Sequence, residues 1–197
     1  MSKLIFYYGT MRSSKSAQLI MTAYNYQQQN KPFIIFKPYV DTRDGNIVKS
    51  RALSTTYPVY TFDENDRGYI YNMVKVRKYH AVLLDEVNFC KEHHIDELAR
   101  IADELNVPVL CFGLLTDFQG ELFEGSKRLV ELADKIQEIK TVCWYCDRKA
   151  RFNMRTVDGE PVFEGEQIQI GDEEYLPVCR KCYMKFKNNK KGVVKEN

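Results

Sequence analysis

A chain of 197 residues, with 44% hydrophobic and 28% charged side chains, can bury the core of one globular domain and at most one small appendage. Its formal net charge of +2 argues against nucleic acid or an anionic membrane as a partner, because both attract strongly basic surfaces. The first apolar run, residues 4–8, is too short for a membrane span or a secretory signal. We therefore expect a cytoplasmic protein whose six cysteines stay reduced.

Short apolar runs alternate with helical patterns over the first two thirds of the chain. After residues 4–8 comes a turn, and residues 15–29 then place Leu19, Ile20 and Ala23 at helix spacing. Later runs are continuously apolar rather than alternating, as in parallel strands that are buried on both faces. These later runs are residues 33–36, 81–84 and 108–112.

Helical patterns at residues 65–78 and 91–105 separate the later runs, and residues 135–140 can form a last strand. Residues 57–66 fit either a strand or a loop. This order of elements predicts an α/β fold with a parallel sheet covered by helices.

The chain changes character near Thr141, which we take as a domain boundary. We expect an ATP-binding α/β domain at residues 1–140, and a small metal-binding domain at residues 141–185. The lysine-rich residues 186–197 are expected to form a solvated basic tail without a function of their own.

The first predicted strand leads into a sequence typical of a phosphate-binding loop (P-loop). Residues 9–16 fit G-x-x-x-x-G-K-[ST], except that Ser14 replaces the second glycine. Backbone N–H groups of such a loop surround the phosphates, Lys15 reaches the outer phosphates and Ser16 can bind Mg²⁺. The candidate ATP-binding residues are Gly9, Thr10, Met11, Arg12, Ser13, Ser14, Lys15 and Ser16. The alternative is an ordinary strand-to-helix turn capped by serine.

Two acids follow the apolar run at residues 81–84, where an open α/β sheet places its ligands. Asp85 can hold hydrated Mg²⁺ beside the β- and γ-phosphates, and Glu86 can accept the proton of an attacking hydroxyl. Acids at this position also serve simply as caps of the next helix. Because the P-loop and the acids follow separate strands of one predicted sheet, the two motifs together favour phosphoryl transfer.

Four of the six cysteines form two C-x-x-C pairs with a long excursion between them. They are Cys143, Cys146, Cys179 and Cys182. Four thiolates suit a structural Zn²⁺ site, which leaves no open position for catalysis and ties down the excursion. Free cysteines or a redox pair are the alternative. Cys90 and Cys111 lie in or beside apolar runs, so we expect them in the core.

Taken in order, the motifs resemble those of the type II thymidine kinases. The series is the P-loop Gly-x-Met-x-Ser-x-Lys-Ser, Lys37-Pro38, Asp41-Thr42-Arg43, Asp85-Glu86, Gly113-Leu114, Phe118-Gln119 and the paired C-x-x-C. The likeness runs from Leu4 to about Tyr183. It implies a RecA-like P-loop parallel sheet that binds ATP, and a small ribbon-like zinc-binding domain whose long loop, the lasso, closes over the thymine.

The resemblance also implies which further residues touch the substrates. On the side of ATP and Mg²⁺ it adds Asp41, Thr42, Arg43 and Asn88. On the thymidine side it adds Phe118, Phe123, Glu166, Gln167, Ile168, Gln169, Ile170 and Tyr175, with the lasso at about residues 164–175. Core packing is the alternative for the two phenylalanines, and a structural ion pair is the alternative for Asp41 and Arg43.

Three residues depart from the family's pattern. Ser14 stands in place of glycine, Asn88 in place of glutamine, and Leu115 where many bacterial and phage members carry arginine. Asn88 reaches one methylene less far, so a contact to the nucleotide would need a water. These changes concern catalytic efficiency much more than fold.

The activity that the resemblance implies is transfer of the γ-phosphate of ATP to the 5′-hydroxyl of thymidine, in a homotetramer inhibited by thymidine triphosphate. Two other readings stay open. One is a RecA-like protein that binds single-stranded nucleic acid through a zinc ribbon, although the excursion between the cysteine pairs is acidic rather than basic. The other is a non-catalytic P-loop protein, which the replacement at Ser14 suggests.

Overall fold

The computed structural model describes residues 3–39, 46–167 and 174–193, with side chains up to residue 189. Six residues that the resemblance assigns to the substrates lie outside the described residues. They are Asp41, Thr42, Arg43, Ile168, Gln169 and Ile170. Among the described residues, no helix is both long enough and apolar enough to cross a membrane.

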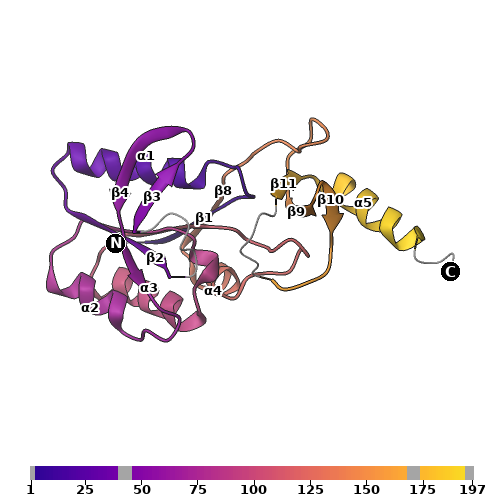
Figure 1. Ribbon diagram of the computed structural model, residues 1–197. Coiled ribbons are helices and arrows are strands. Elements are labelled where there is room, and N and C mark those ends of the chain that lie inside the picture. The colour runs from indigo at the N-terminus through magenta and orange to yellow at the C-terminus, as the bar shows by residue number, and fades with distance from the viewer. Residues whose placement is uncertain (1–2, 40–45, 168–173, 194–197) are drawn as a thin grey trace.

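A six-stranded sheet forms the centre of the larger part of the molecule (Figure 1). Its strands are β1 (Leu4–Tyr8), β2 (Phe33–Pro38), β5 (Tyr60–Phe62), β6 (Ala81–Leu84), β7 (Val109–Gly113) and β8 (Lys135–Glu138). The spatial order is β5-β2-β6-β7-β1-β8, and every neighbouring pair is parallel. The predicted parallel α/β sheet is confirmed, including the last strand. The ambiguous residues 57–66 contain the end of one strand, all of β5 and a turn.

Helices cover both faces of this sheet (Figure 1). They are α1 (Lys15–Gln28) on one face and α2 (Tyr69–Val76), α3 (Glu92–Glu104) and α4 (Glu124–Leu132) on the other. Strand β6 shows why its sequence is continuously apolar: Val82 and Leu84 pack in the core under α2 and α3, and Leu83 packs in the core under α1. We call residues 3–140 the sheet unit.

A two-stranded hairpin, β3 (Ile47–Ser50) and β4 (Leu53–Pro58), lies beside α1 (Figure 1). Its Val48 and Tyr57 are buried in the same core as Leu19 and Ile20 of α1. The hairpin therefore packs on the helix that follows the P-loop, and its turn lies close to that loop.

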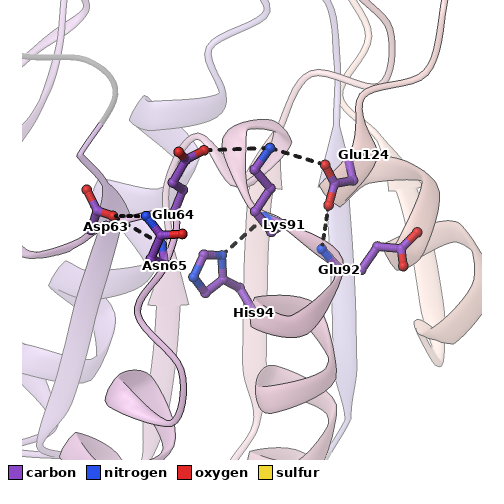
Figure 2. Close-up of polar contacts among 7 residues, drawn as sticks. All are labelled: Asp63, Glu64, Asn65, Lys91, Glu92, His94 and Glu124. Carbon is purple, nitrogen blue, oxygen red and sulfur yellow. Dashed lines mark hydrogen bonds and ion pairs between the residues drawn. The ribbon is translucent and has the colours of Figure 1, made fainter.

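The start of α3 is tied to two neighbouring segments by polar contacts (Figure 2). Lys91 forms ion pairs with Glu64 at 3.7 Å and with Glu124, the first residue of α4, at 3.4 Å. The backbone N–H of Lys91 donates to Nδ1 of the buried His94 at 3.1 Å. The pKa of His94 is lowered to about 4, mainly by burial and then by the neighbouring His93. His94 therefore remains neutral at ordinary pH.

The second part of the molecule, residues 141–193, is called here the four-cysteine unit; Figure 1 shows it at one end of the large sheet. Its antiparallel strands are β9 (Phe152–Val157), β10 (Glu160–Val162) and β11 (Glu174–Val178), in the order β10-β9-β11, followed by α5 (Arg180–Val193).

Two features of this unit were not predicted from the sequence. The excursion between the cysteine pairs has a packed core, because its Met154 and Val178 are almost completely buried together with Tyr183 of α5. The basic run from residue 186 lies on α5, which continues to Val193, and that this run is solvated and has no function of its own stays a prediction. The packing of this polar excursion depends on cross-strand partners, and the lysines on α5 gave no apolar pattern to indicate the helix.

Candidate active site

The P-loop joins the end of β1 to the start of α1. Gly9 follows the strand, and a Cβ there would lie 2.4 Å from Ser13 Oγ and 2.6 Å from the Ile139 carbonyl oxygen, so only glycine fits. Ser14 adopts the left-handed conformation, with φ 64° and ψ 28°, and its hydroxyl makes no capping hydrogen bond. A serine thus adopts the left-handed conformation at the position of the motif's second glycine, and the alternative of a serine-capped turn is not what the structure shows.

Inside the P-loop, the charge of Lys15 and the hydroxyl of Ser13 are available to a ligand. Lys15 Nζ donates to the Thr10 carbonyl oxygen at 2.8 Å. Burial lowers the pKa of Lys15, and the negative charges of Glu86 and Asp85 oppose this shift. Ser13 Oγ is buried and has no hydrogen-bond partner among the described residues. A phosphate would supply both the charge for Lys15 and a partner for Ser13.

The two acids after β6 sit at the carboxyl edge of the sheet. Asp85 is buried, and its N–H donates to the Phe36 carbonyl oxygen of β2 at 3.0 Å. The pKa of Asp85 is raised to about 7, mainly by burial and then by the Glu86 carboxylate, while Lys37 and Lys15 act in the opposite direction. Glu86 is only partly buried and also adopts the left-handed conformation, with φ 52°.

One open cleft of about 970 Å³ brings several of the predicted residues together. Its lining residues are Met11, Arg12, Ser13, Ser14, Lys15, Ser16, Ala17, Lys49, Ser50, Arg51, Ala52, Glu86, Leu114, Glu174 and Tyr175. The P-loop, the acid after β6 and the end of the lasso therefore share one space. The β3–β4 turn, residues 49–52, was missed from the sequence, although two cations around a serine in a short turn were a signal.

Asn88 lies behind this cleft rather than on its wall. It is buried, and its Oδ1 accepts the N–H of Leu114 at 2.9 Å. Gly113 makes room for it, because a Cβ there would be 2.7 Å from the same oxygen. Asn88 thereby links the ends of β6 and β7, and its contact with ATP stays a prediction.

The two phenylalanines of the predicted thymidine site are buried side chains. Phe118 is 2% exposed, and the Arg155 guanidinium lies 4.8 Å from the centre of its ring. The hydroxyl of Tyr183 donates to the Phe118 carbonyl oxygen at 2.7 Å. Phe123 packs edge-on against Phe89, with ring centres 5.8 Å apart. Both residues have core contacts, and their contact with thymine stays a prediction.

The described start of the lasso is fastened to the loop between β7 and α4. Gln167 Nε2 donates to Asp117 Oδ2 at 2.9 Å, and Gln119 Nε2 donates to the Gly165 carbonyl oxygen at 2.7 Å. These bonds bring Gln167 and Glu166 near the segment that holds Phe118. Asp117, a buried acid that sequence reasoning missed, organises this junction because it also accepts backbone N–H groups of its own loop.

The four cysteines of the paired motifs come together, as predicted. Their sulfur atoms all lie within 4.8 Å of one another, with Cys146 to Cys179 at 3.6 Å and Cys146 to Cys182 at 3.8 Å. Zinc–sulfur bonds of about 2.3 Å in a tetrahedron require sulfur atoms about 3.8 Å apart. The cluster, which also contains Cys143, can therefore hold a metal ion. Cys90 and Cys111 are buried in the sheet unit, as expected.

Comparison with known proteins gives the family. A family model described as "Thymidine kinase" matches residues 2–183. A curated thymidine kinase of Streptococcus gordonii is 50% identical over 188 residues, which cover 94% of this chain and 97% of the relative. Those of Lactococcus lactis and Enterococcus faecalis are 48% and 45% identical, over 94% and 93% of this chain and 98% and 95% of the relatives. The chain therefore belongs to the thymidine kinase family.

Proposed function

We propose that this protein transfers the γ-phosphate of ATP to the 5′-hydroxyl of thymidine, producing thymidine monophosphate for DNA precursor salvage. One observation carries the proposal: the P-loop, Glu86 and Tyr175 line the same cleft at the carboxyl edge of the parallel sheet. Phosphoryl transfer needs a phosphate cradle and a proton acceptor on either side of the transferred group, and this cleft contains both. Relatives named thymidine kinase support the choice of acceptor.

The phosphates of ATP are assigned to the P-loop and to the start of α1. Its backbone N–H groups and the positive end of the helix favour negative charge, and Lys15 adds a full charge beside the transferred group. Asp85 and Ser16 would hold Mg²⁺, which neutralises charge on the phosphates when bound. An ionised Asp85 is needed for this, so its pKa of about 7 predicts that Mg²⁺ binding weakens as pH falls below that value.

Glu86 is the proposed proton acceptor for the 5′-hydroxyl. It lines the cleft next to the P-loop and remains partly exposed, so a substrate hydroxyl can reach it. Among the described residues that line the cleft there is no histidine. His93 and His94 lie on α3, below the other face of the sheet, and His80 is exposed before β6.

Thymine is assigned to the junction of the lasso with residues 114–123. An uncharged flat base needs an aromatic face and backbone groups that match its imide edge, and we propose Phe118, Phe123 and Tyr175 for the first role. Backbone groups of residues 166–170 are proposed for the second. A base that presents an exocyclic amine would leave buried groups unpaired, at a cost of about 1 to 3 kcal/mol, so deoxycytidine should be a poor substrate.

We assign Zn²⁺ to the four cysteines, because their sulfur spacing fits a tetrahedral thiolate site without an open position. The ion would tie the residues around Cys143 and Cys146 to the start of α5, and so support the lasso. The division into an ATP-binding domain at residues 1–140 and a zinc-binding domain at residues 141–185 belongs to this proposal. So do a cytoplasmic location, a homotetramer and inhibition by thymidine triphosphate.

Transfer of radiolabelled phosphate from ATP to thymidine, with deoxycytidine and single-stranded DNA as comparison acceptors, tests the proposal. We expect phosphorylated thymidine and little of either alternative product. Glu86→Gln should keep ATP binding and lower kcat by about 10² or more. Glu131→Gln, at an exposed acid on α4 that pairs with Arg128, is the matched control and should retain the wild-type rate.

Two results would overturn it. ATP hydrolysis stimulated by single-stranded DNA, without labelled thymidine monophosphate, would indicate the nucleic-acid-binding alternative. A wild-type protein without ATP binding would indicate a P-loop that has lost its function.

A further inference from the structure

The P-loop is held by a side chain from the four-cysteine unit. The N–H of Met11 donates to Asn153 Oδ1 at 2.7 Å, and Asn153 Nδ2 donates to the Thr116 carbonyl oxygen at 3.1 Å. Asn153 lies in β9 and is 3% exposed, so both ends of its amide are used in a dry environment. It fixes the orientation of the peptide group that enters the central turn of the P-loop.

The next residue of the loop, Arg12, is held by two other side chains of the same unit. Arg12 has a left-handed backbone, with φ 60°, and its guanidinium pairs with Glu174 of β11 at 2.6 Å. The same guanidinium lies 5.0 Å from the centre of the Trp144 ring. Trp144 is one of the two residues between Cys143 and Cys146, so the Cys143–Cys146 knuckle itself contacts the P-loop.

These contacts give the four-cysteine unit a role beyond support of the lasso. Each exposed contact to Arg12 is weak by itself, but together with the buried bond to Met11 they hold two consecutive residues at the point where the backbone turns left-handed. The same contacts also set the direction of the Arg12 side chain. It points to Glu174 and Trp144, so Lys15 is left as the P-loop cation beside the two acids.

We propose that Asn153, acting on Met11, and Glu174 and Trp144, acting on Arg12, are positioning residues through which the four-cysteine unit sets the shape of the phosphate site. The inference rests on the proposed function in so far as the P-loop binds ATP. The four-cysteine unit then controls affinity for the phosphates of ATP.

The first readout is hydrogen–deuterium exchange of the P-loop peptide, residues 9–18, in the full-length protein without ligands. Asn153→Ala removes the buried bond and should raise exchange there about tenfold, and Trp144→Leu should raise it about threefold. Tyr145→Leu is the matched control. Tyr145 belongs to the same knuckle but packs on Phe186 of α5, with ring centres 4.9 Å apart, so P-loop exchange should remain within about twofold of wild type.

The second readout is the dissociation constant for ADP by calorimetry, with the metal content of each variant measured by elemental analysis. Affinity should fall by about tenfold in Asn153→Ala and about threefold in Trp144→Leu and Glu174→Gln, at unchanged metal content. Arg12→Lys should retain more affinity than Arg12→Ala, since a lysine can still pair with Glu174. Trp144 is the only tryptophan of the chain, so a change of its emission in Arg12→Ala reports the contact directly.

Two outcomes would overturn the inference: P-loop exchange in Asn153→Ala equal to wild type, or equal effects of Trp144→Leu and Tyr145→Leu. Failure of the proposed function has a different signature, because wild-type protein would then not bind ADP. The exchange comparison needs no nucleotide and decides the positioning role in either case.

Discussion

The sheet unit and the four-cysteine unit differ in what holds them together. The central strands of the sheet unit are buried on both faces, so that β6 contributes Val82 and Leu84 to one core and Leu83 to the other. The four-cysteine unit has a single small core, in which Cys143 and Cys179 stand beside a few apolar side chains. A core of that size gives little stability by itself, and a metal can supply the remainder.

The two units also differ in the residues that they contribute to the proposed site. Residues proposed to meet the phosphates and Mg²⁺, such as Lys15 and Asp85, lie at the edge of the parallel sheet. Residues proposed for recognition of the base lie at the junction with the smaller unit, on segments that depend on its integrity. Substitutions in the two units should therefore impair different properties of the protein.

Loss of the P-loop lysine should give the largest effect on chemistry with the smallest effect on fold. Lys15→Ala removes a full charge that neighbouring amides cannot replace, and kcat/KM should fall by at least about 10². Melting temperature and metal content should stay at wild-type values. Steady-state kinetics, with Lys78→Ala at an exposed site as the control, checks this. Unchanged kcat/KM would remove Lys15 from the proposed machinery.

Loss of the metal should show the opposite pattern. In Cys143→Ser we expect about one zinc per chain to be lost, a red shift of Trp144 emission and at least a tenfold higher KM for thymidine, while the helices of the sheet unit persist by circular dichroism. Cys90→Ala, at a buried cysteine of the sheet unit, should keep the metal. Full activity in chelator, from protein that contains no zinc by elemental analysis, would contradict a structural role.

A substitution at the junction of the units separates base recognition from core packing. Phe118→Ala should raise the KM for thymidine about 10- to 100-fold and leave the KM for ATP nearly unchanged, because stacking on a base is worth about 1 to 3 kcal/mol. Kinetics with each substrate varied in turn measures the ratio. If both KM values rise equally, Phe118 is a core residue only.

The unusual serine of the P-loop should matter little. Ser14→Gly relieves a left-handed backbone that costs about 1 to 2 kcal/mol, and we expect kcat/KM to change by no more than about tenfold. Asn30→Gly, at another left-handed residue outside the site, is the control and should give no kinetic change. A Ser14→Gly variant that gains ATP binding from an inactive wild type would mean that the natural loop is defective.

The smallest effect concerns stability in acid, far from the cleft. His94 is buried and neutral, with a pKa of about 4 against 6.5 in an unfolded chain. The unfolded chain therefore binds more protons between these values, and stability falls as pH drops through that window. His94→Gln should reduce the difference between the urea midpoints at pH 7 and pH 5. An unchanged difference would assign the acid sensitivity to other groups.

Local sequence was sufficient for the sheet and for the placement of the P-loop and the two acids at its edge. The apolar runs predicted the parallel strands because a strand buried on both faces cannot alternate, and the order of P-loop and acids then followed from the parallel arrangement. The C-x-x-C spacing likewise predicted the cluster around Cys143, since each pair is short enough to place two sulfurs together whatever the rest of the chain does.

Tertiary structure alone decided how the two units meet. Asn153 is 142 residues from Met11, and Glu174 is 162 residues from Arg12, so no local pattern could pair them. The core of the excursion between the cysteines and the hairpin turn at residues 49–52 were missed for the same reason. Periodicity records which side of its own element a residue occupies, whereas a contact between distant segments depends on the packing of the whole chain.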